Sequence, residues 1–258
     1  MKKFIQNRKG QKIAVVVDEI ENSKELVFVM HGLGGSKDQP LIKTFAEAYL
    51  ENGFTVVRFD TTNTFGESDG EYEDATVTNY YEDLEDVISW AKKQIWYREF
   101  FWLAGHSLGG ICTALFAEKN SENVKALAPI STVVSNTLVS GAYTDEMLKK
   151  WKETGYRIMP RASMPGTFKK LKWGFYEDRM KYDLLENASK LVMPVLLVVG
   201  EYDESTPVNH QQIFFESLPY KKELHIIKGA EHTFASSEHL AEVKKILSEW
   251  IEKNKKIE

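Results

Sequence analysis

Short, mostly apolar runs recur along the chain, and segments with apolar residues three or four positions apart lie between them. Such a run is typical of a strand buried on both faces, and the spaced pattern is typical of a helix covering a sheet. The apolar runs span residues 26–30, 54–59, 100–104, 124–130, 195–199 and 224–227, and the helical patterns span 37–52, 79–93, 111–116, 207–218 and 236–254. Residues 12–17 are expected to form an edge strand. This order predicts an α/β fold, with a mostly parallel sheet and helices on both of its faces.

One segment interrupts this order. The stretch 131–193 is too long for a single helical crossover between strands. Its pattern predicts a helix at 144–154 and a hairpin at 156–175 with a turn at 164–167. We expect a small cap, spanning about 133–182, above the carboxyl ends of the strands. An elaborate loop elsewhere on the surface is the alternative.

Length and composition narrow the class of protein. The 258 residues are 43% hydrophobic and 28% charged, which suits one globular domain over 1–258. The net charge of −5, with both signs interspersed, gives no general attraction to nucleic acid. No apolar stretch is long enough to span a membrane, and the lysines at the start are not followed by the apolar segment of a signal peptide. The single cysteine, Cys112, can form no internal disulfide, so a reducing cytoplasm is expected.

A serine lies between two glycines at the end of a predicted strand. Residues 105–110 read Gly-His-Ser-Leu-Gly-Gly, directly before a predicted helix. This Gly-x-Ser-x-Gly pattern is typical of a sharp strand-to-helix turn that exposes the serine hydroxyl. We therefore expect Ser107 to be a nucleophile.

A serine hydroxyl needs a base to activate it and a carboxylate to orient that base. Asp203 follows the predicted strand at 195–199, and His232 follows the one at 224–227. We assign His232 as general base and then acid, and Asp203 as the group that fixes the imidazole tautomer. Glu201 and Glu204 are rival acids.

Acyl transfer also needs donors for the oxyanion that develops on the substrate. The backbone N–H of Leu108, at the start of the helix after Ser107, is one expected donor. The second is the N–H of Leu33, in the glycine-rich loop 31–35 that follows the strand at 26–30.

These motifs resemble those of the α/β-hydrolase superfamily, and the resemblance extends over nearly the whole chain. Within it, the chain is similar to small bacterial carboxylesterases of the cinnamoyl (feruloyl) esterase and monoacylglycerol-lipase-like type. The resemblance implies a mostly parallel eight-stranded sheet with a small helix-plus-hairpin cap inserted after the sixth strand. After the strand at 54–59, the segment 60–70 departs from the sequence common in relatives and keeps only Gly66-x-Ser68-x-Gly70.

The expected activity is that of a serine carboxylic-ester hydrolase acting through an acyl-enzyme on small-molecule esters with short-to-medium acyl or aryl, including cinnamoyl-type, groups. Alternatives on the same triad are a serine peptidase or amidase and a thioesterase; a non-catalytic ligand-binding protein of this fold is a further alternative. No metal or other cofactor is expected, and the oligomeric state stays open. Between Asp145 and Tyr182 basic residues outnumber acidic ones, which raises the hypothesis of an aromatic pocket in a positive field. Trp151, Tyr156 and Trp173 are candidates for substrate binding there.

Overall fold

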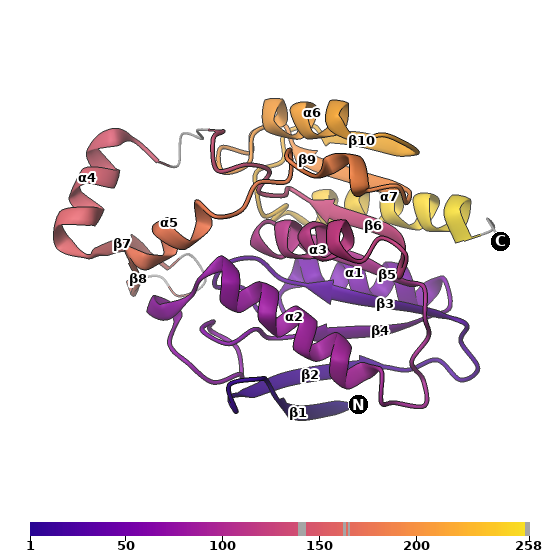
Figure 1. The fold of residues 1–258 in the computed structure, drawn as a ribbon. Coiled ribbons are helices and arrows are strands. Elements are labelled where there is room, and N and C mark those ends of the chain that lie inside the picture. The colour runs from indigo at the N-terminus through magenta and orange to yellow at the C-terminus, as the bar shows by residue number, and fades with distance from the viewer. Residues whose placement is uncertain (139–142, 162–163, 165, 256–258) are drawn as a thin grey trace.

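A central eight-stranded sheet organises the molecule (Figure 1). The computed structural model describes residues 1–138, 143–161, 164 and 166–255. The sheet strands are β1 (Lys2–Gln6), β2 (Lys12–Asp18), β3 (Glu25–Met30), β4 (Phe54–Phe59), β5 (Phe101–His106), β6 (Val124–Ile130), β9 (Val195–Gly200) and β10 (Lys222–Ile227). They lie in the order β1-β2-β4-β3-β5-β6-β9-β10. The pairs β1–β2 and β2–β4 are antiparallel, and all other pairs are parallel.

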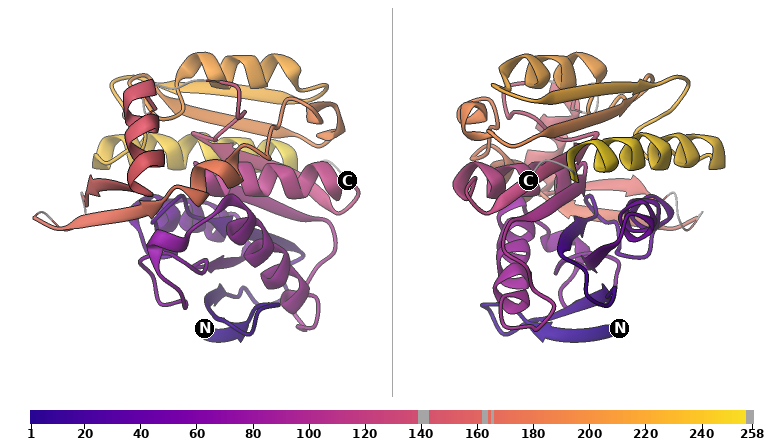
Figure 2. Two further views of the ribbon diagram at one scale, coloured as in Figure 1. Left: turned by 60° about the vertical axis from the view of Figure 1, so that its left-hand side comes forward. Right: turned by 90° about the vertical axis from the view of Figure 1, so that its right-hand side faces the viewer.

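Helices cover both faces of this sheet. They are α1 (Pro40–Glu51), α2 (Val77–Ala91), α3 (Leu108–Lys119), α6 (Val208–Ser217) and α7 (Ser237–Lys255). Helices α1 and α7 pack together on one face, and α2 and α3 pack together on the other. Figure 2 shows α3 and α7 on opposite sides of the sheet. Side chains of β3 alternate between the two cores: Phe28 belongs to the cluster on the α3 face, and Val27 to the one on the α7 face. A strand buried on both faces is apolar at every position, which explains the continuous runs in the sequence.

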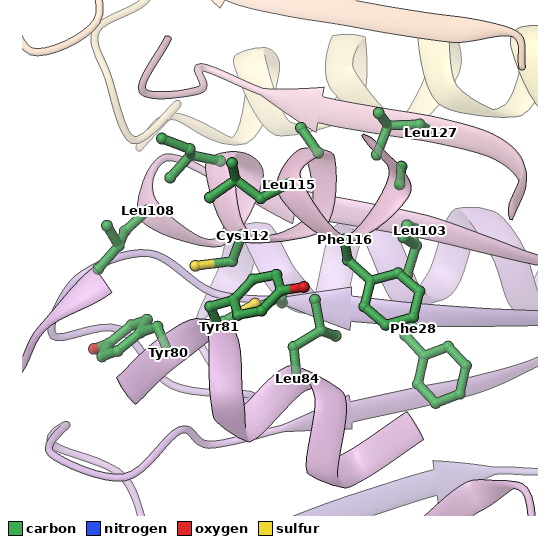
Figure 3. Close-up of a cluster of buried hydrophobic side chains, with 14 of the residues drawn as sticks. Phe28, Tyr80, Tyr81, Leu84, Leu103, Leu108, Cys112, Leu115, Phe116 and Leu127 are labelled. Carbon is green, nitrogen blue, oxygen red and sulfur yellow. The ribbon is translucent and has the colours of Figure 1, made fainter. Parts of the chain in front are cut away.

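The α3 face holds the larger of these clusters (Figure 3). Cys112 and Leu115 from α3 meet Tyr81 and Leu84 from α2, and every one of these side chains is buried. This packing fixes the direction of α3, whose first residue follows Ser107. Figure 3 also places Leu108 at that end of the helix.

The helices and strands described within the segment 133–182 lie together at one side of the sheet, and we call this segment the insertion (Figure 1). It contains α4 (Asp145–Thr154), the paired strands β7 (Tyr156–Pro160) and β8 (Phe168–Lys172), and α5 (Gly174–Arg179). The Thr144 hydroxyl caps α4, and Gly155 ends it with a positive φ of 76°. The helix at 144–154 is therefore confirmed, whereas the hairpin ends at Lys172, because α5 begins at Gly174. Pro165, in the predicted turn, lies outside the described residues.

One expectation at the start of the chain needs correction. The segment 12–17 is not an edge strand, because β1 pairs with it antiparallel and takes the edge. Only Ile5 of β1 is buried, so that strand carries almost no hydrophobic signal. The remaining structured segments are two short 3-10 helices, at Tyr72–Asp74 and Ala188–Lys190.

Candidate active site

Ser107 stands at the sharp turn between β5 and α3. Its backbone adopts φ 56° and ψ −113°, a strained conformation for a residue with a side chain, of the kind that costs on the order of 1–3 kcal/mol. The flanking glycines allow the close packing that holds it. A Cβ on Gly105 would lie 2.3 Å from the Gly109 carbonyl oxygen, and one on Gly109 would lie 2.5 Å from the His31 carbonyl oxygen. Any larger residue at either position would displace α3 from the sheet.

The structure brings Ser107, Asp203 and His232 together from three loops that follow β5, β9 and β10. The Nε2 atom of His232 lies 2.9 Å from Ser107 Oγ, and its Nδ1 atom lies 2.8 Å from Asp203 Oδ2. An ionised carboxylate can only accept, so the Nδ1–H of His232 donates to Asp203. That tautomer leaves Nε2 free to accept the hydrogen of the Ser107 hydroxyl.

Asp203 is buried and surrounded by donors. Its Oδ1 accepts the backbone N–H groups of Ser205 at 2.9 Å and Thr206 at 2.8 Å. The Thr206 hydroxyl lies 2.8 Å from Oδ2 and 3.0 Å from the Ser131 carbonyl oxygen. Burial by itself raises the pKa of Asp203, but the hydrogen bonds from His232 and Thr206 lower that pKa to about 2. The sequence analysis missed Thr206, whose only signal was its place directly before Pro207.

The two rival acids point elsewhere. Glu201 is exposed, and its carboxylate accepts the backbone N–H of Gly229 at 2.8 Å, which ties the β9 loop to the β10 loop. Glu204 is exposed as well. Within the described part of the chain, neither carboxylate forms a hydrogen bond with His232.

A second histidine supports the loop that carries His232. The Nε2 atom of His106 lies 2.9 Å from the His232 carbonyl oxygen, to which it donates as Nε2–H. Burial and the nearby His232 lower the pKa of His106 to about 3, so its ring stays neutral. The residue next to Ser107 therefore helps to hold the imidazole opposite it.

The loop after β3 lies against the serine. A Cβ on Gly32 would come within 3.1 Å of Ser107 Cβ, so the absence of a side chain allows this approach. The backbone N–H of Gly34 donates to the Tyr80 hydroxyl at 3.1 Å, which anchors the loop to α2. Leu33 lies between these two fixed points.

Leu33 and Leu108 both line the pocket that contains Ser107. Leu108 is the first residue of α3, where backbone N–H groups have no partner inside the helix and the helix dipole is positive. Among the described residues, neither N–H donates to another backbone carbonyl. Both are available to an oxyanion formed beside Ser107.

The pocket has a volume of about 430 Å³ and lies between the sheet and the insertion. Its wall combines the loop after β3, the turn at Ser107 and side chains of the insertion, among them Tyr143 and Phe175. The proposed aromatic candidates do not line it. Trp151 is buried inside the insertion, with Trp173 packed edge-on at 5.6 Å, and Tyr156 is exposed on the outer side of the hairpin.

The described residues include neither a cluster of metal ligands nor a helix that could span a membrane. No group of three histidine, cysteine or carboxylate side chains there could hold a metal ion. In the same part of the chain, no helix combines the length and the apolar character needed to cross a bilayer.

The sequence matches a known protein family. The sequence model of the alpha/beta hydrolase fold matches residues 25–162, and the chain belongs to this family. The expected fold class is thereby confirmed. An uncharacterized 31.7 kDa protein from the traX-finO intergenic region of Escherichia coli is 27% identical over 224 residues, covering 75% of this chain and 77% of that protein.

Solved structures show the same fold over the whole chain. Est1E from Butyrivibrio proteoclasticus, in a structure with ferulic acid bound, superposes with a TM-score of 0.82 at 24% identity and 98% coverage of both chains. Alpha/beta hydrolase domain-containing protein 10 from mouse superposes with a TM-score of 0.81 at 20% identity, covering 98% of this chain and 99% of that one. At these identities the likeness concerns the fold.

Proposed function

We propose that this protein is a serine hydrolase of carboxylic esters that acts through an acyl-enzyme. The observation that carries the proposal is the continuous hydrogen-bonded series from Ser107 Oγ through His232 to the buried carboxylate of Asp203, at 2.9 and 2.8 Å. A series of this kind makes a serine hydroxyl nucleophilic at neutral pH.

In the first half of the reaction, Ser107 Oγ attacks the ester carbonyl carbon and its proton passes to His232 Nε2. The N–H groups of Leu33 and Leu108 bind the oxyanion of the tetrahedral intermediate. That intermediate collapses as His232 gives the proton to the departing alkoxide. The acyl group stays on Ser107.

In the second half, a water molecule attacks the acyl carbon and gives its proton to His232 Nε2. The second tetrahedral intermediate uses the same two N–H donors, and its collapse returns the proton to Ser107 Oγ. Throughout, Asp203 stays ionised, holds the imidazole tautomer and stabilises the imidazolium that forms in each half.

The proposed substrates are esters with short-to-medium acyl or aryl groups, and the insertion acts as a cap over them. The size of the pocket, about 430 Å³, supports a substrate of this range. The likeness to Est1E, whose structure holds ferulic acid, supports the inclusion of aryl groups.

The test combines covalent labelling with turnover. We expect a fluorophosphonate probe to label the wild type stoichiometrically at Ser107, and the Ser107→Ala variant not at all. The wild type should hydrolyse at least one of 4-nitrophenyl acetate, butyrate and octanoate or methyl cinnamate, and the variant none. Labelling with no ester turnover would contradict ester hydrolysis and favour a peptide or thioester substrate. Absence of labelling would contradict an assembled nucleophile.

A further inference from the structure

The wall of the pocket that belongs to the insertion is strongly basic. Arg157, Arg161, Lys169 and Arg179 all line the pocket that contains Ser107. No aspartate or glutamate is among the described residues that line it. Histidines aside, every acidic or basic side chain of the described lining is therefore a cation.

The β7–β8 hairpin turns two of these cations toward the pocket. On β7 the half-buried Arg157 faces the pocket, while its neighbour Ile158 is 60% exposed. On β8 the half-buried Lys169 faces the pocket, while Phe168 is 68% exposed. Successive side chains point to opposite faces of a strand, so Met159 and the buried Leu171 share the inner face with Arg157 and Lys169, while Lys170 and Lys172 lie on the outer face. The orientation that buries Leu171 therefore also places Arg157 and Lys169 at the pocket.

One aromatic ring of the insertion positions two of the cations. Tyr143 lines the pocket, and its ring centroid lies 5.1 Å from the guanidinium carbon of Arg157 and 4.7 Å from that of Arg179. A ring face attracts a cation without cancelling its charge. Both guanidinium groups therefore lie against the same ring at the wall of the pocket.

A second aromatic platform comes from the segment after β4. Phe65 stacks on Tyr72 with the ring centroids 4.5 Å apart. The guanidinium carbon of Arg161 lies 3.8 Å from the Phe65 ring centroid, and Lys169 Nζ lies 5.6 Å from that of Tyr72. This platform holds the hairpin over the pocket through ring faces.

Two lysines of β8 show how the inner and outer sides differ. The outer one, Lys172, forms ion pairs with Glu73 and Asp74, and these carboxylates raise its pKa to about 12. The inner one, Lys169, forms no ion pair with a carboxylate in the described structure. Burial lowers the pKa of Lys169, and repulsion from Arg157 lowers it further. A bound anion would relieve both effects.

We infer that the preferred substrates are esters that carry a carboxylate, and that this carboxylate binds against Arg157, Arg161 and Lys169. The two guanidinium groups suit a planar carboxylate, because their N–H donors match its two oxygens. The inference rests on the proposed ester hydrolysis and names the substrate class of the same site.

The test uses substrates matched except for charge. Mono-4-nitrophenyl glutarate is compared with 4-nitrophenyl valerate, so that the charge lies on the acyl side. 4-Acetoxybenzoate is compared with its methyl ester, so that the charge lies on the alcohol side, and each rate is divided by the rate of alkaline hydrolysis. We expect kcat/KM to favour the anionic member of at least one pair by about tenfold or more, and the preference to shrink as the salt concentration rises.

Variants on opposite sides of β8 provide the control. Lys169→Gln should reduce the anionic-to-neutral ratio of kcat/KM by about fivefold or more, since one charge near the carboxylate is removed. Lys170→Gln removes the same charge from the exposed outer side of the strand and should leave the ratio unchanged. Equal ratios for both variants would overturn the inference, as would a wild type that prefers the neutral member of both pairs. If either result is accompanied by hydrolysis of the neutral esters and labelling of Ser107, the charge preference is refuted and ester hydrolysis is not. If the neutral esters are not hydrolysed and Ser107 is not labelled, both the charge preference and ester hydrolysis are refuted.

Discussion

At the scale of single residues, burial distinguishes three acidic side chains that stand within four positions of one another. Glu201 and Glu204 are exposed, whereas Asp203 is buried against His232. Two backbone N–H groups and a hydroxyl donate to Asp203, so its charge is stabilised where a lone buried carboxylate would be costly. We therefore place the orienting role on Asp203 alone.

Replacing Asp203 by asparagine tests this assignment. The amide keeps the shape of the side chain but favours the wrong histidine tautomer, so kcat should fall by about 10⁴-fold with little change in KM. Steady-state kinetics on the best ester substrate provide the measurement. Glu204→Gln, at the next position of the chain and exposed, is the matched control and should retain wild-type kcat. A loss confined to the Glu204 variant would transfer the role to that residue.

Glu118, on α3, makes stability depend on pH. Burial raises its pKa from 4.5 to about 8, and one of its carboxylate oxygens has no hydrogen-bond partner in the described structure. Because the folded state keeps the proton up to about pH 8, stability present below pH 4.5 is lost as the pH rises between these values. Thermal unfolding should show a smaller decrease in Tm from pH 5 to pH 8 for Glu118→Gln than for wild type. The exposed Glu122→Gln should follow the wild type, and parallel curves for all three proteins would refute this account.

At the scale of elements, the hydrophobic pattern predicted the strands and helices that bury a continuous or one-sided apolar surface. It placed β3, β4, β6 and β9 to within one residue at either end. It missed β1, because that strand buries one side chain and is held mainly by backbone hydrogen bonds to β2. Main-chain hydrogen bonds do not depend on side-chain polarity, so the hydrophobic pattern could not predict an edge strand of this kind.

One buried ion pair joins two elements and gives a prediction of its own. Lys37, just before α1, lies 2.9 Å from Asp60, which follows β4, and both side chains are almost fully buried. Removing one partner leaves an unpaired buried charge, so Lys37→Met should lower the free energy of unfolding by about 3–5 kcal/mol. Urea unfolding measures the loss.

The control for this pair is a lysine on the surface. Lys244 pairs with Glu47 and Glu51 between α7 and α1, where both carboxylates are exposed. Lys244→Met should therefore cost about 1 kcal/mol or less. Similar losses for Lys37→Met and Lys244→Met would show that burial does not govern the Lys37 pair.

At the scale of the whole molecule, aromatic side chains of the insertion join the core on the α3 face of the sheet. Trp151 is buried among them, and its indole N–H donates to the Leu171 carbonyl at 2.9 Å. The rings of Phe175 and Tyr143 stack on Trp151, with centroids 6.5 and 6.3 Å away. These contacts hold the hairpin in place over the pocket.

Trp151→Ala should loosen the insertion while the sheet stays folded. Loss of a large buried aromatic residue costs about 3–5 kcal/mol, and the neighbouring rings cannot fill the space. We expect trypsin to cut the hairpin at Arg157 or Lys169 faster in the variant, by about tenfold or more, with unchanged far-ultraviolet circular dichroism. Tyr156→Ala, on the exposed outer side of the hairpin, should be cut at the wild-type rate. Equal rates for both variants would mean that Trp151 does not hold the insertion.

The α/β fold class, the order of most strands and helices, and the loops on which Ser107, Asp203 and His232 lie could all be predicted from the amino-acid sequence. This was possible because strand burial, glycine turns and motif spacing are local properties of the chain. Three-dimensional packing was needed to show which carboxylate meets the imidazole, that Thr206 and His106 hold the pair, and that Arg157 and Lys169 face the pocket. Those facts depend on burial and on contacts between residues far apart in sequence. The amino-acid sequence of a strand does not show whether a basic residue faces solvent or a pocket, because packing decides between the two.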